Sequence, residues 1–261
     1  MEKEMEEKDE GSSRRAEVSP QPKASFPAQS PSNSRTLLYP QRHANSYDSR
    51  KYFVTRPGAF DQAMEDLKTH LAANKGEVAH SFWLLTEIDH WNIEKERIVV
   101  LTDAALLVCK YDFIMLKCLE LQRIPLNYIE RISTGPFAFP EKSLDRRNGE
   151  GLRIFWDKQQ EPNFLSRWNP WSTDMPYTTF TEHPVKNGCP RLSPICQVSA
   201  FQAQLVQAVQ EAQEMHPAPG RIPGVVLVSE PIFIQTYTGM MAFFGNQNKL
   251  GYCLARGSIG F

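Results

Sequence analysis

Apolar positions recur with a helical period in two segments of the chain, 59–73 and 199–215. Residues three and four apart lie on one face of a helix, so both segments are predicted to form amphipathic helices. Their apolar faces consist of Phe60, Ala63, Met64, Leu67 and Leu71 in the first and Phe201, Leu205, Val209 and Ala212 in the second. Ser199 and Gln202 have the spacing of a capping box, which predicts that Ser199 caps the second helix.

Between and after these helices the chain consists of short runs of β-forming residues that are separated by turn residues. The runs predicted to be strands are 81–88, 97–102, 105–111, 114–124, 128–133, 152–156, 177–181, 225–228 and 232–236. In the fourth run Leu119 and Leu121 alternate with polar residues, which predicts one buried and one solvated face. In 152–156, Leu152, Ile154 and Trp156 are expected to share one face.

This order of elements predicts an α+β fold. We expect a pleckstrin-homology-like, partly open β-barrel that is closed by the C-terminal amphipathic helix. Two additions to this barrel are predicted: an N-terminal helix over 59–73 and C-terminal strands after residue 220. Together with the barrel they are predicted to form a single domain over 51–261. Residues 1–50 are rich in Glu, Lys, Ser, Pro and Gln with isolated apolar residues, so they are predicted to be a disordered N-terminal arm.

Composition and charge argue against several classes of function. The formal net charge of −1 lacks the basic excess that is typical of nucleic-acid binding. The chain begins with charged residues rather than a secretory signal, and the apolar stretch 222–245 is interrupted by proline and polar residues, so no transmembrane segment is expected. The five cysteines include no C-x-x-C pair and are expected to be reduced thiols in the cytosol. We interpret Cys109 and Cys118 as small buried side chains.

Several segments closely resemble the tumour protein p63-regulated gene 1 family. They are 83–86, 89–92, 94–97, 109–114, 167–173, 179–184, 248–252 and 256–261, and the resemblance extends from about residue 50 to the C-terminus. It implies a homology domain shared with a Sac-type inositol phosphatase, outside that enzyme's catalytic module, with a pleckstrin-homology-like fold and a tendency to self-associate. It also implies a cytoplasmic or vesicle-peripheral location. Because the family includes a presynaptic protein, the resemblance further implies presynaptic scaffold proteins and calmodulin as partners of this chain.

The residues themselves do not predict catalysis. Sac-type phosphatases use a Cys-x5-Arg loop, in which the guanidinium and backbone amides hold the phosphate that the thiolate attacks. No cysteine of this chain has an arginine at that spacing, and there is no phosphate-binding glycine loop and no His-x-x-x-His pair. We therefore expect neither an enzyme nor a bound cofactor or metal. The helix over 199–215 contains Glu211 and Glu214 but no Lys or Arg, which does not match a basic calmodulin target.

Two segments are candidates for contact with partners. Tryptophans beside an Asn-Pro turn either cap the core or anchor a partner, because Trp and Arg are enriched at interfaces. The candidate protein-contact residues are Arg167, Trp168, Asn169, Pro170 and Trp171. Arg146 and Arg147 are candidates for weak lipid contact, although the loop 89–97, where pleckstrin-homology domains hold phosphoinositides, is as acidic as it is basic.

Together these observations predict a non-catalytic cytoplasmic interaction or adaptor protein. We expect it to self-associate as a homo-oligomer, in the simplest case a homodimer, and to be associated with vesicle surfaces. The alternative is a peripheral phosphoinositide-binding membrane adaptor, which requires a converging patch of Lys and Arg.

Overall fold

The structure is a computed structural model that describes residues 52–74, 77–156, 169, 175–220, 223–235, 240, 242 and 246. The predicted disordered arm over 1–50 lies outside the described residues. So does the C-terminal stretch 247–261 of the predicted 51–261 domain.

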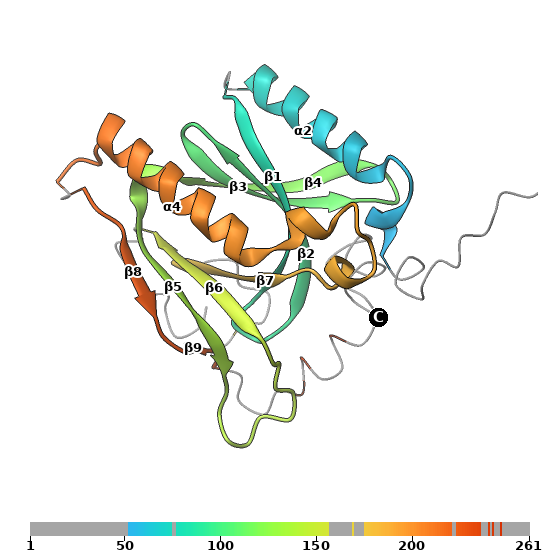
Figure 1. Cartoon of the computed structure of the whole chain (residues 1–261), viewed down its shortest axis with the longest axis vertical. Coiled ribbons are helices and arrows are strands. Elements are labelled where there is room, and N and C mark those ends of the chain that lie inside the picture. The colour runs from blue at the N-terminus through green and yellow to red at the C-terminus, as the bar shows by residue number, and fades with distance from the viewer. Residues whose placement is uncertain are drawn as a thin grey trace, which may run out of the picture. The chain divides into compact units, whose positions relative to one another are not determined.

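Two α-helices and a set of strands make up most of the described chain (Figure 1). The helices are α2 (Ala59–Asn74) and α4 (Val198–Met215), with short 3-10 helices η1 (Phe53–Thr55), η2 (Leu126–Tyr128), η3 (Pro184–Asn187) and η4 (Ser193–Cys196). The strands are β1 (Ala79–Ile88), β2 (Glu94–Thr102), β3 (Ala105–Asp112), β4 (Lys117–Pro125), β5 (Ile129–Ala138), β6 (Glu150–Trp156), β7 (Tyr177–Glu182), β8 (Val226–Ser229) and β9 (Ile232–Phe233).

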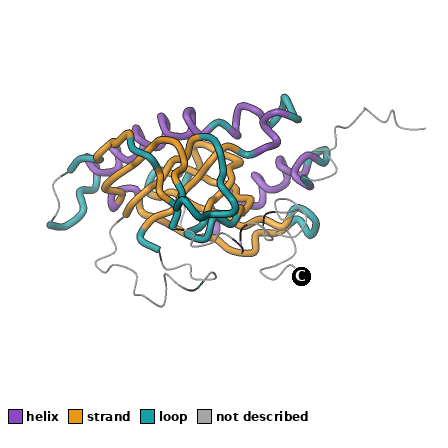
Figure 2. The backbone as a smooth tube through the Cα atoms, turned by 90° about the horizontal axis from the view of Figure 1, so that it is seen from below, coloured by secondary structure: helices purple, strands orange, loops and turns teal. Residues whose placement is uncertain are grey.

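The described strands form one mixed, nine-stranded open sheet. Its order is β4-β3-β2-β1-β7-β6-β5-β8, and β9 pairs with β5 beyond β8. Neighbours are antiparallel except that β8 and β9 run parallel to β5. Strands β4 and β8 therefore lie at the two ends of this order, and the perpendicular view shows the helices running along the outside of the strands (Figure 2). The predicted α+β class, with an N-terminal and a C-terminal helix around a sheet, is confirmed.

Two hydrophobic cores lie on opposite faces of the first strands, because successive side chains of a strand point to opposite sides. On β1, Leu84 belongs to the core that α2 covers, whereas Trp83 and Leu85 belong to the core that α4 covers. Both predicted helical faces are buried against the sheet, through Phe60 and Leu67 of α2 and through Phe201 and Leu205 of α4. In this way one sheet stabilises both helices.

The predicted cap of the second helix is wrong. The helix begins at Val198, and Gln197 occupies the N-cap position without a side-chain hydrogen bond to the helix. Ser199 therefore lies inside the first turn. The reason is tertiary: the chain enters α4 directly from η4, and burial of Val198 in the core sets the start of the helix two residues earlier than the capping pattern indicates.

The fourth predicted strand is also corrected. Residues Ile114 to Leu116 form a turn, and β4 starts at Lys117. The pairing shifts at this point, since Lys110 faces Glu120 whereas Tyr111 faces Cys118, which leaves Leu119 as an extra residue in a bulge. Leu119 is consequently exposed rather than buried, contrary to the simple alternation.

Candidate interaction site

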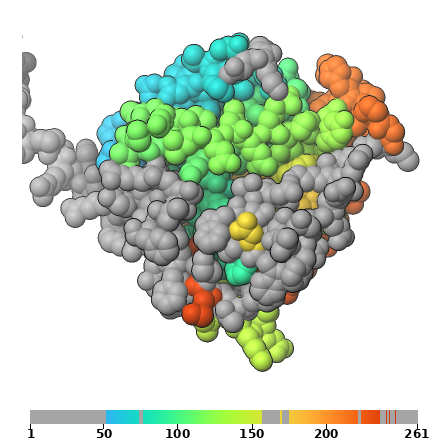
Figure 3. Space-filling model, turned by 180° about the vertical axis from the view of Figure 1, so that it is seen from behind, coloured from blue at the N-terminus to red at the C-terminus, as the bar shows by residue number. Residues whose placement is uncertain are grey.

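Large apolar side chains are exposed around the hairpin that joins β3 to β4. Met115 is 62% exposed, Leu116 45% and Leu119 39%. We refer to these three residues as the apolar tip. The space-filling view from behind shows the green band of the chain that contains β3 and β4 across the upper part of this face (Figure 3). Exposed apolar groups that cluster in this way are typical of contact surfaces rather than of ordinary turns.

The backbone of the hairpin turn is held in a conformation that disfavours leucine. The buried carboxylate of Asp112 accepts hydrogen bonds from the main-chain N–H groups of Ile114 (2.8 Å) and Met115 (3.0 Å). The chain then turns through Leu116 with φ of 51°, in the left-handed region that glycine and asparagine favour. An L-residue with a large side chain costs about 1–2 kcal/mol there. Because Leu116 is also exposed, this cost is not offset by burial within the described fold.

Strand β4 beside the apolar tip is an edge strand among the described strands, since its pairing partner in the sheet is β3. Edge strands present main-chain N–H and C=O groups to a further strand, and proteins that avoid pairing usually place charges there. The charged residues of β4 include Lys117 at its start and Arg123 near its end. Arg123 forms an ion pair with Glu77, with 2.7 Å between Nη2 and Oε1.

A polar cluster joins the β1–β2 loop to the loop between β5 and β6. We call it the polar junction, and it comprises Asn92, Glu94, Asp145, Arg147 and Asn246. Asn92 is fully buried at its centre, with φ of 64°. Its amide group donates to the main-chain oxygen and Oδ2 of Asp145 (3.3 Å each), and its Oδ1 accepts from Nε of Arg147 at 2.8 Å.

The C-terminal segment also joins the polar junction. Asn246 donates from Nδ2 to the main-chain oxygen of Asn92 at 2.8 Å and accepts at Oδ1 from the main-chain N–H of Glu94 at 3.0 Å. Hydrogen bonds between residues far apart in sequence thus hold the β1–β2 loop against the β5–β6 loop and Asn246.

The two candidate lipid-contact residues have different environments. The guanidinium of Arg147 lies 2.9 Å from the carboxylate of Glu94, and its side chain is only 13% exposed. Arg146 is exposed and donates to the main-chain oxygen of Glu141. The structure therefore leaves Arg146 at the surface and places the charge of Arg147 in an internal ion pair.

The candidate protein-contact segment is described at one position. Asn169 is exposed, and its main-chain oxygen accepts a hydrogen bond from Nε2 of His90 at 3.1 Å. The other predicted contact residues, Arg167, Trp168, Pro170 and Trp171, lie outside the described residues. Burial lowers the pKa of His90, which favours a neutral ring that donates through Nε2. This contact links Asn169 to the β1–β2 loop.

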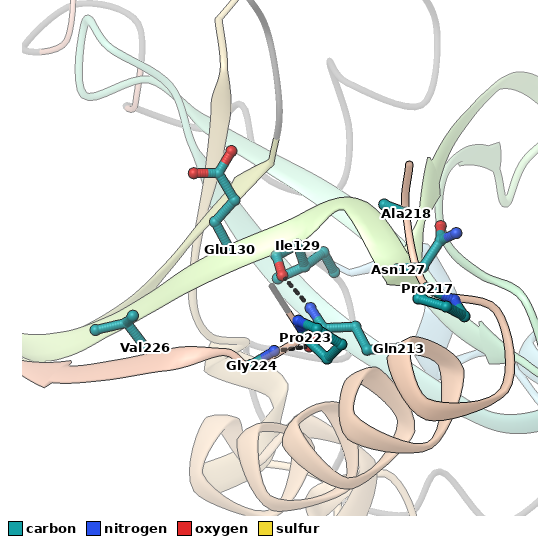
Figure 4. Close-up of a pocket in the computed structure, with 9 residues that line it drawn as sticks. All are labelled: Asn127, Ile129, Glu130, Gln213, Pro217, Ala218, Pro223, Gly224 and Val226. Atoms are coloured by element: carbon teal, nitrogen blue, oxygen red, sulfur yellow. Dashed lines mark hydrogen bonds between the residues drawn. The ribbon is translucent and has the colours of Figure 1, made fainter. Parts of the chain in front are cut away.

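A shallow cavity of about 310 Å³ lies where α4 ends beside the starts of β5 and β8. In the close-up, Glu130 and Val226 lie toward one end of the cavity, and Asn127, Pro217 and Ala218 toward the other (Figure 4). Its central polar side chain, Gln213, donates to the main-chain oxygen of Ile129 and accepts from the main-chain N–H of Gly224, both at 2.8 Å. These bonds join β5 to the segment before β8, so Gln213 is already used in holding the fold together.

The described residues contain neither a cluster of metal-ligating side chains nor a helix that could span a membrane. Nowhere among them do three or more His, Cys, Asp or Glu side chains gather as metal ligands would. Neither α2 nor α4, nor any other helix of the described chain, has the length and hydrophobicity needed to cross a membrane.

The sequence patterns did not predict the apolar tip or the polar junction. The apolar tip was hidden inside a run that favoured a strand, because a leucine at a left-handed position gives no turn signal of the kind that Gly or Asn gives. The polar junction was missed because its members come from three separate segments. The only signal in the sequence was Asn92, which tolerates the left-handed region better than other non-glycine residues.

Comparisons with known proteins define first a domain class and then a family. Residues 51–157, which include β1 to β6, match the family described as "hSac2: Inositol phosphatase". The hSac2 domain from the human phosphoinositide phosphatase Sac2 superposes with a TM-score of 0.40 at 16% identity, covering 69% of this chain and 91% of that domain.

The human tumor protein p63-regulated gene 1 protein is 57% identical over 228 residues, which cover 87% of this chain and 83% of that protein. The chain belongs to the tumor protein p63-regulated gene 1 family, as the sequence resemblance indicated.

Proposed function

We propose that this chain is a non-catalytic interaction protein that self-associates through the apolar tip and the adjoining edge of β4. The observation that carries the proposal is Leu116, an exposed leucine in a left-handed turn where glycine would cost less. Strained residues are retained where a local contact requires them, and here the contact lies outside the described fold.

Pairing of two β4 strands across a twofold axis is the arrangement that uses both features. An antiparallel pair over Lys117–Pro125 would satisfy the edge N–H and C=O groups and place each apolar tip beside the C-terminal end of β4 in the other copy. Stable dimers bury about 1,200–2,000 Å² in total, which three side chains per copy cannot supply. The main chain and side chains of Lys117–Pro125 must therefore contribute as well.

The order of the strands β4 to β5 and the helix α4 over one core support a variant of the pleckstrin-homology-like barrel. In such a module the loop between β1 and β2 is the usual place for phosphoinositide headgroups. Here that loop is held by the polar junction, and the cation of Arg147 is neutralised by Glu94. This favours protein contact over the alternative, a peripheral phosphoinositide-binding adaptor.

A cytoplasmic location at vesicle surfaces and contact with presynaptic scaffold proteins remain predictions from the family resemblance. Calmodulin as a partner needs a segment other than α4. The apolar face of α4 is buried in the core, and its exposed face contains Gln and Glu but no Lys or Arg.

The test is the mass of the full chain in solution, measured by light scattering with size exclusion from about 1 to 100 μM. A double variant, Met115→Ser with Leu116→Ser, is compared with Val226→Ser and Leu227→Ser on the opposite edge strand, where the apolar side chains are equally exposed. Self-association that is lost in the first variant and kept in the second supports the proposal. A strictly monomeric wild-type chain, or a dimer that survives the first double substitution, refutes it.

The lipid alternative is separated in the same samples by sedimentation with phosphatidylcholine vesicles that contain a few per cent phosphoinositide. We expect the chain to stay in the supernatant. Sedimentation that is abolished by Arg146→Gln would make the membrane adaptor the better assignment.

A further inference from the structure

Two thiols lie in contact on the neighbouring strands β3 and β4. The sulfur atoms of Cys109 and Cys118 are 3.1 Å apart. Cys109 is completely buried, whereas Cys118 is partly exposed near the sheet edge. We propose that Cys109 and Cys118 are a thiol modification site that closes reversibly to an intramolecular disulfide in response to a hydroperoxide.

The bulge at Leu119 creates this pair. In the register that holds from Ala105 to Lys110, Cys109 lies opposite Leu121. Continued without interruption, this register would set Cys118 opposite Asp112 and point its side chain to the other face of the sheet. The extra residue shifts Cys118 to lie opposite Tyr111, on the same face as Cys109.

The two sulfurs differ in reactivity in a way that suits sequential oxidation. Either S–H can donate in this contact, but Cys109 is the more deeply buried thiol, and donation from it stabilises a thiolate on Cys118 and lowers the pKa of Cys118. The same hydrogen bond, together with burial, raises the pKa of Cys109. Thiolate character therefore resides on the partly exposed sulfur, which is the one that a reagent from solution can reach.

The reaction balances with one peroxide per pair. The Cys118 thiolate attacks an O–O oxygen, which forms a sulfenic acid and releases hydroxide or alkoxide that takes up a proton. The sulfur of Cys109 then attacks the Cys118 sulfur, losing its proton as the S–S bond forms and water leaves. The two thiols together lose two electrons, and the peroxide gains them. A dithiol reductant reverses the step by exchange at the accessible Cys118 sulfur.

The fold permits the movement that closure requires. An S–S bond is about 2.05 Å long, so the sulfurs must approach by about 1 Å. Cys118 lies on β4, which has β3 as its neighbour at this end of the described sheet, so the edge strand can shift without displacing a second partner. Cys196, in contrast, is buried, and burial raises its pKa to about 12. It serves as an internal control thiol that should stay reduced.

The experiment treats the full chain with increasing hydrogen peroxide, alkylates the remaining thiols and digests with trypsin. Cleavage after Arg97, Lys110, Lys117 and Arg123 places the two cysteines on the separate peptides 98–110 and 118–123. We expect a disulfide-linked pair of these peptides at peroxide concentrations at least ten-fold below those that oxidise Cys196. Dithiothreitol should restore both thiols.

Two variants complete the test. Cys118→Ser should abolish the linked peptides, and Cys109→Ala should leave a sulfenic acid on Cys118 that dimedone labels. The proposal is overturned if both thiols stay as resistant as Cys196, if Cys118 links to another copy of the chain, or if it proceeds to sulfinic acid with Cys109 still reduced. The double serine variant of the apolar tip retains both cysteines, so failure of self-association leaves this result unchanged.

Discussion

Glycine substitution at Leu116 and at Asn92 should have opposite effects on stability, although both residues have left-handed backbones. At Leu116, glycine removes a conformational cost of about 1–2 kcal/mol. It adds about 0.4–1 kcal/mol of chain entropy to the unfolded state. In the monomer the exposed side chain loses little burial, so at protein concentrations too low for self-association Leu116→Gly should stabilise the fold by about 0.5–1 kcal/mol. Leu116→Ala, which keeps a β-carbon, should be close to neutral.

At Asn92 the side chain, rather than the backbone, decides the result. Asparagine tolerates φ of 64°, so glycine relieves little strain. The substitution removes the acceptor of Arg147 and the donor to Asp145 inside a buried cluster. Unsatisfied buried groups cost about 1–3 kcal/mol each, so Asn92→Gly should destabilise the fold by about 2–4 kcal/mol.

The assay is urea unfolding of the full chain, followed by tryptophan fluorescence, with thermal melts as a second readout. For a domain of 150–250 residues, 1 kcal/mol corresponds to about 2–4 °C in Tm. Leu116→Gly should therefore raise the Tm by about 1–4 °C, and Asn92→Gly should lower it by about 4–16 °C. A Leu116→Gly variant that is less stable than Leu116→Ala would refute the reasoning, because it would mean that the turn is not strained.

Three further predictions concern other parts of the fold. Gly135→Ala should destabilise it by more than about 2 kcal/mol in urea unfolding, because a β-carbon there would lie 2.2 Å from the main-chain oxygen of Glu230. Gln213→Leu should cost about 1–3 kcal/mol by loss of two buried hydrogen bonds, and an unchanged midpoint would show that they are dispensable. Burial lowers the folded-state pKa of His90, so stability should be complete above the unfolded pKa of about 6.5 and fall as the pH drops below it. His90→Gln, which keeps a donor, should flatten this part of the pH profile, and an unaltered profile would assign the effect to other groups.

The parts of the fold that depend on local periodicity were predictable from the sequence. Leu152 and Ile154 are both buried in one core, and α2 and α4 bury the faces that their apolar spacing indicated. The predicted alternation of buried and exposed residues failed at Leu119. The bulge adds one residue to β4, so the side chains that precede it point to the opposite face of the sheet from the one that uninterrupted alternation would give. No single-strand pattern contains that information, since a bulge is a property of the pairing.

The candidate site was less predictable, because its members meet only in three dimensions. Arg147 directly follows Arg146 in sequence, yet it forms a partly buried ion pair with Glu94 whereas Arg146 lies at the surface. Cys109 is buried as predicted, whereas the prediction for Cys118 was wrong, since it is partly exposed on the edge strand; the contact between them depends on the register of β4. Charge and hydrophobicity along the chain cannot separate these cases, whereas strand pairing does.

The parallel strands at the end of the chain have a consequence for folding. Arg131 in β5 pairs with Val226 in β8, so this strand edge stays unsatisfied until the C-terminal part of the chain has been synthesised. Contacts so far apart in sequence form slowly, because a long loop must close first. A chain that is truncated before residue 226 would keep α4 and most of the core but would expose a β5 edge rich in main-chain donors and acceptors. Such a truncated chain should aggregate soon after its release from the ribosome rather than accumulate as a smaller folded protein.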